Sequence, residues 1–254
     1  MNGHKLAFLY TPAIEAMNYP PDCPFKTQRS TLTRAKIASF GLLHGPCSRE
    51  VPARRASLPE LRRIHTAEYL TELERASAGD LTAEGFRMGL GGQDTPIFND
   101  MFEYGAWACG AGLVAADVLL RGEADIAFNL LGGFHHAMPG MASGFCYLND
   151  VALACDAFTR AGKRVVYLDV DAHHGDGVQE VFYDRSDVLT ISMHESGKTL
   201  FPWGGFENET GRGHGLGYNA NIPLPAGTYD EAFLFAFKRA AAPRREFDAG
   251  WRRS

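Results

Sequence analysis

The 254-residue chain lacks the patterns that mark several large classes of protein. Its five cysteines are odd in number and form no CxxC pair, which argues against a disulfide framework or a cysteine-rich zinc site and favours a reducing compartment. No apolar run is long enough to span a membrane, and the N-terminal segment has neither the basic start nor the apolar core of a signal peptide. We therefore expect a soluble, cytoplasmic protein with no membrane partner.

An excess of basic residues is also missing. The chain has 25 Lys and Arg against 30 Asp and Glu, a net charge of -5, and no Lys/Arg stripe, which argues against direct binding of nucleic acid. We find no internal repeat, low-complexity tract or linker, and the hydrophobic content of 45% is ordinary for a globular protein. A single domain over residues 1–254 is the expected organisation.

What the sequence does contain is an alternation of apolar strands and helices. The strands have continuous apolar cores, which is typical of a mostly parallel sheet covered on both faces, and ligands bind such α/β sheets beyond the carboxyl ends of the strands. Small residues in the longest helix should permit close packing. The expected strands are 5–10, 125–131, 164–170 and 187–193, and the expected helices are 30–43, 58–76 in two pieces, 99–122 and 149–163.

The stretch VVYLDVDAHHGDGVQEVF, residues 165–182, places several ionisable side chains directly after an apolar strand. Burying such groups costs several kcal/mol unless they are paired or bind metal. If the chain stays extended, alternation puts Asp169, Asp171 and His173 on one face, where a carboxylate and an imidazole can hold one cation. The alternative is an acid–histidine network that only ties strand to helix. The density of these groups before Gly-Asp-Gly favours a metal site.

A second segment, GGFHHAMPG, carries the adjacent histidines His135 and His136. Glycines before them and Pro-Gly after them predict a loop, and the apolar sequence on both sides favours a buried cleft over two surface histidines. Imidazoles suit general acid–base chemistry because their pKa lies near neutral pH. Each would need a carboxylate behind it, and Asp169 and Asp176 are candidates for that role.

Together, GGFHHAMPGMASGFCYLNDVALA and RVVYLDVDAHHGDGVQEVFYDRSDVLTISMHE resemble the zinc-dependent histone deacetylases, and most of all their bacterial acetoin-utilisation and acetylpolyamine deacetylase-like relatives. The resemblance runs from about residue 5 to about residue 240. It implies the three-layer arginase/deacetylase fold with a mostly parallel central sheet. It also implies hydrolysis of an N-acetyl amide by metal-activated water, on an acetylated lysine peptide or an acetylated amine or polyamine. Zinc and ferrous iron both suit oxygen and nitrogen ligands, so the metal is not decided by the residues. The oligomeric state also stays open.

The resemblance assigns roles to individual residues. The catalytic group comprises the metal ligands Asp171 and His173, the pair His135 and His136 beside the metal-bound water, and Asp169 and Asp176 behind these two histidines respectively. The substrate-binding group comprises Asp94 at the rim and Gly144, Phe145 and Phe201 along the acyl tunnel, although Phe201 could also be ordinary core. Structural K⁺ or Na⁺ ions would lie at Asp169, Asp171, His173, Ser192 and Met193, and at Phe182, Arg185 and Val188 near Tyr218.

The sequence also departs from this family. The family's third metal ligand, an aspartate, and its oxyanion-binding tyrosine both come from motifs nearer the C-terminus, and neither motif is present. Residues 241–254 read as a divergent tail of an incomplete domain lacking its C-terminal strands, and Asp248 is a poor candidate for the third ligand. The deacetylase could then be impaired. The alternative is an inactive truncated member that acts as a binding protein or is a non-functional fragment. An arginase-type hydrolase is disfavoured by the histidine pair followed by SGFC.

Overall fold

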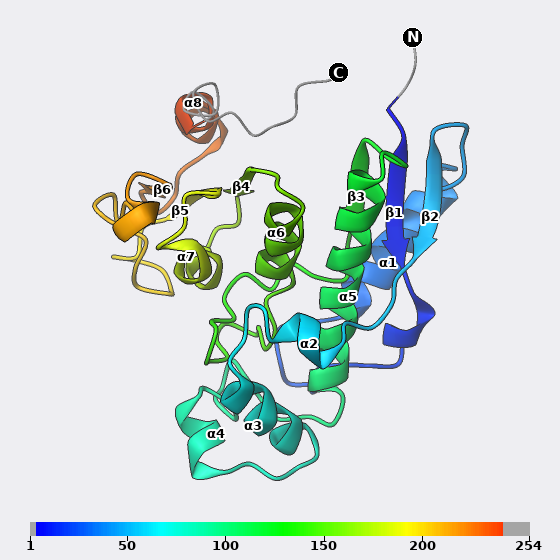
Figure 1. Ribbon diagram of the computed structural model, residues 1–254, viewed down its shortest axis with the longest axis horizontal. Helices are drawn as coiled ribbons and strands as arrows, with labels where there is room; N and C mark the ends of the chain where they lie inside the picture. Colours follow the sequence, from blue (N-terminus) through cyan, green and yellow to red (C-terminus); the bar gives the residue numbers. More distant parts are fainter. Residues whose placement is uncertain (1–3, 241–254) are drawn as a thin grey trace. The chain divides into compact units, whose positions relative to one another are not determined.

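The computed structural model describes residues 4–240 of the chain. Its contacts divide the chain into two compact units, residues 1–157 and residues 158–254, and the division falls within helix α6 (Asp150–Arg160). Each unit contains one three-stranded sheet whose strands all run parallel (Figure 1). The parallel sheets expected from the continuous apolar strands are therefore present.

The sheet of the first unit has β1 (Leu6–Tyr10) at its centre, between β2 (Ser48–Pro52) and β3 (Ile126–Asn129). Its central strand is the most deeply buried, with Ala7 and Leu9 at 0% exposure. Parallel neighbours need long crossover connections, and helices supply them here. Helix α5 (Met101–Leu120) packs against β1 and β3, as the green helix beside the blue strand in Figure 1 shows.

Helix α5 owes its position to small side chains. A Cβ on Gly110 would lie 1.8 Å from the Arg54 carbonyl oxygen, and one on Gly105 would lie 3.1 Å from Leu148. The Ala56 amide donates to the Ala106 carbonyl at 2.9 Å, so an extended segment lies directly on the helix. The close packing expected from the glycine and alanine content is confirmed.

Three of the remaining helices of this unit begin at well-formed caps. Thr66 and Thr82 accept from backbone amides three residues later, and Ser57 and Glu60 form a capping box. Such caps satisfy amides that the first helical turn leaves without partners. The elements are the 3₁₀ helix η1 (Pro12–Ile14) and the helices α1 (Gln28–Ser39), α2 (Leu58–Leu61), α3 (Ala67–Ser77) and α4 (Ala83–Arg87).

The second unit is built around β5 (Val188–Glu195), which pairs with β4 (Val165–Asp169) and β6 (Asn219–Leu224). Leu189, Ile191 and Met193 of β5 form the centre of its core. Helix α7 (Asp176–Phe182) contacts β5, and helix α8 (Asp230–Ala240) contacts β6. A 3₁₀ turn, η2 (Gly213–Gly215), precedes β6.

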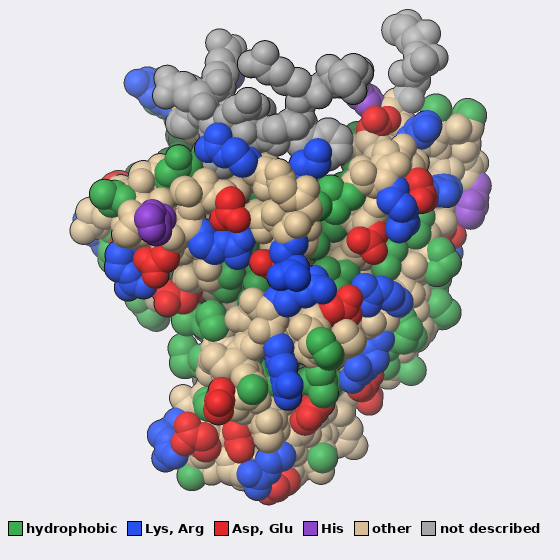
Figure 2. Space-filling view, in the orientation of Figure 1, with side chains coloured by type: hydrophobic (Ala, Val, Ile, Leu, Met, Phe, Trp, Pro, Cys, Tyr) green, Lys and Arg blue, Asp and Glu red, His purple; other side chains and the backbone are tan. Residues whose placement is uncertain are grey.

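Every strand and helix expected from the sequence is present, with ends that differ by up to a few residues. Elements not foreseen are β2, β6, α4, α7 and α8. On the face shown in Figure 2, basic and acidic side chains of the described residues are interspersed. Among these residues no helix is both long and apolar enough to cross a membrane. The tail at 241–254, with Asp248, lies outside the described residues.

Candidate active site

Asp171 and His173 come together directly after strand β4. The strand ends at Asp169, and a turn follows in which the His173 amide donates to Asp171 Oδ1 at 2.8 Å. The same carboxylate oxygen lies 2.9 Å from His173 Nδ1. The side chains of Asp171 and His173 are 53% and 42% exposed, whereas Asp169 is buried and accepts from the Asp171 amide. A turn, rather than strand alternation, therefore pairs the two expected ligands.

This pair fits a metal ion as two of its ligands. Zinc lies about 2.0–2.2 Å from carboxylate oxygen and imidazole nitrogen, so two such atoms 2.9 Å apart can both reach one ion. Within residues 4–240 no group of three or more His, Cys, Asp or Glu side chains is arranged to hold a metal. The described residues thus offer two candidate ligands, Asp171 and His173, for one site.

A buried polar network fixes the backbone that carries the pair. Gln179 Oε1 on α7 accepts from His174 Nε2 at 3.1 Å and from the Asn219 and Asn221 side-chain amides, each at 2.8 Å. The Gln179 amide in turn donates to Glu209 Oε2 at 2.7 Å. Burial lowers the pKa of His174, which favours the neutral form of its imidazole. The residue after the candidate ligand His173 is thereby anchored to α7 and β6.

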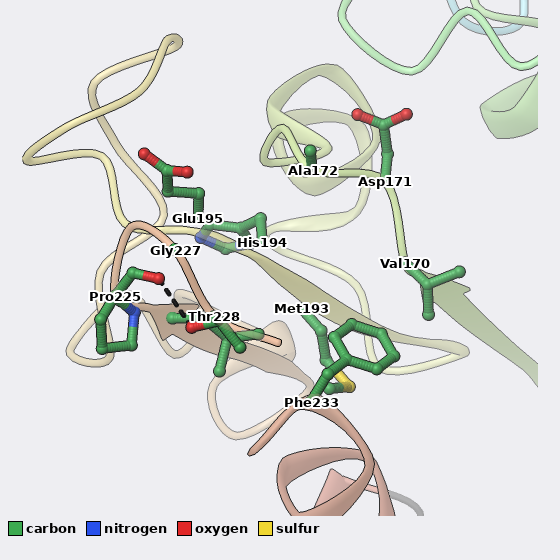
Figure 3. A pocket seen from close by; sticks show the side chains of 11 residues that line it. Val170, Asp171, Ala172, Met193, His194, Glu195, Pro225, Gly227, Thr228 and Phe233 are labelled. Atoms are coloured by element: carbon green, nitrogen blue, oxygen red, sulfur yellow. Dashed lines mark hydrogen bonds between the residues drawn. The ribbon is translucent and has the colours of Figure 1, made fainter. Parts of the chain in front are cut away.

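A pocket of about 250 Å³ opens at the carboxyl ends of β4, β5 and β6, as expected for a parallel sheet. Figure 3 shows its walls: Val170 and Ala172 flank Asp171, Met193 to Glu195 end β5, and Thr228 donates to the Pro225 carbonyl. The Asp171 carboxylate points away from Met193 and Phe233. The pocket therefore lies behind the turn that holds the candidate ligands Asp171 and His173.

The histidine pair lies in the loop between β3 and α6, and it is buried as expected. His135 and His136 are 8% and 5% exposed, and their ring centroids are 4.1 Å apart. The Asp150 carboxylate, at the start of α6, accepts from the amides of Gly133 and Phe134, at 3.0 and 2.8 Å to Oδ1. Those amides immediately precede the pair, so Asp150 determines where the loop enters the site. Burial raises the pKa of Asp150 to about 6.

His65 and Asn149 hold the other end of this loop. His65 Nδ1 donates to the Met138 carbonyl at 3.0 Å, and its Nε2 accepts from the Asn149 amide at 3.0 Å. Asn149 also caps α6 by accepting from the Ala152 amide, and its side-chain amide donates to the Ala137 carbonyl at 2.9 Å. Burial lowers the pKa of His65 to about 4, which keeps this imidazole neutral.

The expected rim and tunnel residues Asp94, Gly144 and Phe145 meet in the first unit. The Gly144 amide donates to Asp94 Oδ2 at 2.9 Å, and the Phe145 amide donates to the Asp94 carbonyl at 2.9 Å. Phe145 has a φ of 66°, which is strained for a side chain of this size. The Tyr19 hydroxyl holds it by donating to its carbonyl at 2.7 Å. Such strain persists only where surroundings impose it, and it is concentrated at functional sites.

The second predicted tunnel aromatic, Phe201, lies in the second unit with the candidate ligands Asp171 and His173. Its ring packs edge-on against His173, with centroids 6.3 Å apart. Asp176 begins α7, where its carboxylate accepts from the Gly177 amide at 3.0 Å. The placement of Asp169 behind His135 and of Asp176 behind His136 stays a prediction. So do the K⁺ or Na⁺ sites, although Asp169 and Ser192 are neighbours in the register of β4 and β5.

Sequence reasoning missed the residues whose hydrogen bonds hold the segments that carry the candidate site residues. Of these, only Asn149 and Asp150 had a signal in the sequence, because they stand where a helix cap is expected. His65 is distant in sequence from the loop it holds, and no pattern connects the two. The supporting residues are Tyr19, His65, Asn149, Asp150 and Gln179.

Comparison with known proteins gives one consistent result. The histone deacetylase domain model matches residues 23–249. Acetoin utilization protein AcuC of Bacillus subtilis is 44% identical over 237 residues, which are 92% of this chain and 61% of that protein. Histone deacetylase clr6 of Schizosaccharomyces pombe is 36% identical over 238 residues, or 92% of this chain and 58% of that protein. The chain thus spans about three fifths of the length of these relatives.

Solved structures agree with the sequence relatives. A crystal structure of an HDAC homolog from Aquifex aeolicus matches with a TM-score of 0.87 at 36% identity, covering 96% of this chain and 65% of that chain. An HDAC homolog complexed with SAHA matches with a TM-score of 0.86 at the same identity and coverage. The expected fold is therefore confirmed, and the chain belongs to the histone deacetylase domain family.

Proposed function

We propose that this protein is a metal-dependent deacetylase that hydrolyses N-acetyl amides. The observation that carries the proposal is the Asp171–His173 pair, whose ligand atoms lie 2.9 Å apart beside the aromatic ring of Phe201. Zinc or ferrous iron fits this donor set. A metal ion bound there would polarise the acetyl oxygen and lower the pKa of a water molecule.

The histidine pair supplies the proton transfers. One imidazole of His135 and His136 takes a proton from the attacking water, and a protonated imidazole delivers one to the departing amine nitrogen. Their burial excludes bulk water from this exchange, and Asp150 with Asn149 fixes the loop that presents them. A carboxylate behind each ring would set its tautomer and basicity, which is the role we propose for Asp169 and Asp176.

The remaining predicted residues bind the substrate. Phe145 and Phe201 provide aromatic surface for the methylene chain that links the acetamide to the rest of the substrate. Asp94 uses one carboxylate oxygen to hold Gly144, and we propose that this residue also accepts from a substrate amide at the rim. The substrate is an acetylated lysine peptide or an acetylated amine or polyamine. We also propose a cytoplasmic location, which the odd number of cysteines and the lack of a CxxC pair support.

Hydrolysis of an acetyl-lysine peptide by the zinc-loaded chain tests this function, with a ferrous arm alongside. Loss of an outer-shell partner already costs about 10–100-fold, so Asp171→Asn should lower kcat/KM by more than about hundredfold. Asp184→Asn is the matched control, because Asp184 is exposed and pairs only with Arg212 among the interactions seen for it. A chelator should abolish the turnover of both the wild type and Asp184→Asn. Equal activity in Asp171→Asn and wild type would refute the proposed site.

A further inference from the structure

Helix α8 buries one face and leaves the opposite face in solvent. Its inner side chains recur at helical spacing and pack against the core of the second unit; they are Phe233, Ala236, Phe237 and Ala240. Figure 3 shows Phe233 beside Met193 of β5. On the outer face, Leu234 and Phe235 are 53% and 63% exposed. Two large apolar side chains therefore lie next to each other in water.

The apolar surface continues beside Phe235. A hollow of about 300 Å³ lies between α8 and the strands β5 and β6. Its walls are apolar apart from Arg239, whose guanidinium carbon lies 5.3 Å from the centroid of the Phe235 ring. Single exposed apolar residues are common on monomeric proteins, whereas a contiguous apolar surface indicates an interaction site. The outer face of α8 is therefore a candidate interface, and its charges indicate what covers it.

The charged residues of α8 are divided between its two ends. The acidic residues lie in the first turn and the basic residues in the last turn. Lys238 follows Glu231 by seven residues, which is about two helical turns, so both lie on the same face of the helix. Both side chains are exposed, and Leu234 and Phe235 lie between them. The outer face thus runs from an acid through an apolar centre to a base.

This order makes the outer face of α8 complementary to itself. If two copies of α8 pack antiparallel about a two-fold axis, Glu231 of each copy lies opposite Lys238 of the other. Leu234 of each copy then lies opposite Phe235 of the other, between the two ion pairs. A parallel arrangement would instead place Glu231 beside Glu231 and Lys238 beside Lys238, which is unfavourable.

From these observations we propose that the outer face of α8 binds the same face of a second copy of this chain. The contact is small, because the 11 residues of α8 span only about 16 Å, and a stable interface buries more than about 1,000 Å². The dimer is therefore weak and reversible. Its formation involves neither the proposed metal nor the acetamide substrate, so it is measured without them.

Sedimentation equilibrium of the 254-residue chain with charge-reversed variants tests the pairing. The mean mass of the wild type should rise from that of a monomer towards that of a dimer as its concentration increases. An exposed ion pair contributes up to about fivefold in affinity, and symmetry supplies two such pairs, so Glu231→Lys or Lys238→Glu should raise the Kd by about tenfold or more. An equimolar mixture of these two variants should recover dimers, because each opposed pair is then Lys against Glu. Glu68→Lys, which reverses an exposed acid in the first turn of α3, is the matched control and should leave the Kd unchanged.

A second variant tests the apolar centre. Truncating a central aromatic residue of an interface typically costs about fivefold or more in affinity, so Phe235→Ser should also weaken the dimer. Phe86→Ser removes a phenylalanine of α4 that is 62% exposed, close to the 63% of Phe235, and should leave the Kd unchanged. An unchanged urea midpoint of the dilute Phe235→Ser chain would show that its fold is intact. A wild type that stays monomeric up to about 1 mM overturns the proposal. So do dimers that Phe235→Ser leaves intact, or a charge-reversed mixture that fails to recover them.

Discussion

At the scale of single residues, the loop that carries His135 and His136 is held by two buried ionisable groups, and burial shifts their pKa values in opposite directions. His65 and Asp150 both lie behind the loop, and burial favours the neutral form of each. For His65 this depresses the pKa, and for Asp150 it raises the pKa. The two groups therefore make opposite contributions to the pH dependence of stability.

Replacing His65 should make the protein less sensitive to acid. The pKa of His65 is lowered from 6.5 to about 4, so between these values the unfolded chain binds a proton that the folded chain does not. Folding stability then decreases as the pH falls through this window, by at most about 1.4 kcal/mol per pH unit. Urea unfolding at pH 4.5 and pH 7 should show a larger acid-induced loss in wild type than in His65→Gln. Equal losses would show that His65 does not titrate differently on folding.

Asp150→Asn should have the opposite effect. The pKa of Asp150 is raised from 3.8 to about 6, so between these values the folded chain holds a proton that the unfolded chain has lost. Wild-type stability should therefore decrease relative to the variant as the pH rises from 4 to 6. The amide oxygen of Asn can still accept from the Phe134 amide, which limits the structural change. If the free energy of unfolding of the wild type instead rises relative to that of the variant between pH 4 and pH 6, the fold favours the ionised carboxylate.

At the scale of elements, helix α5 depends on the absence of a side chain at Gly110. A Cβ there would lie 1.8 Å from the Arg54 carbonyl oxygen, which is backbone and cannot rotate away. Gly110→Ala should lower the free energy of unfolding by about 1–3 kcal/mol or more, despite the better helix propensity of alanine.

Gly112 in the same helix offers the matched control for that experiment. A Cβ on Gly112 would lie 3.2 Å from the Asp150 carbonyl oxygen, so only a small adjustment is needed. Gly112→Ala should change the urea midpoint much less than Gly110→Ala does. Similar midpoints for the two variants would contradict the packing described for α5.

At the scale of the whole molecule, metal binding should be linked to stability. A ligand that binds only the folded chain stabilises it by about 2.7 kcal/mol at a concentration one hundred times its Kd. Zinc should therefore raise the unfolding midpoint of wild type and of Asp184→Asn, but not of Asp171→Asn. Hydrogen exchange should show the added protection at Asp169–Asp176, because that turn carries the two proposed ligands. Protection elsewhere with none at this turn would place the metal at another site.

Local sequence patterns determined most of the strands and helices of this protein and the place of its candidate site. Continuous apolar runs followed by helical segments predict parallel sheets, since a strand buried on both faces cannot alternate polar and apolar residues. The same reasoning marks the ends of the strands as the place for chemistry, and it predicts Asp171, His173, His135 and His136 as site residues without coordinates. Short or polar elements such as β2 and β6 escaped prediction, because their burial comes from distant partners and not from their own pattern.

Only the tertiary structure decided how these residues are held. The pairing of Asp171 with His173 depends on a turn after Asp169, where strand alternation would have kept the chain extended. The support of the histidine loop by His65 joins residues 84 positions apart, counted from His65 to Asn149. The local sequence shows which side chains follow each strand. Contacts between distant segments form only when the chain folds, and these contacts set the geometry of the site.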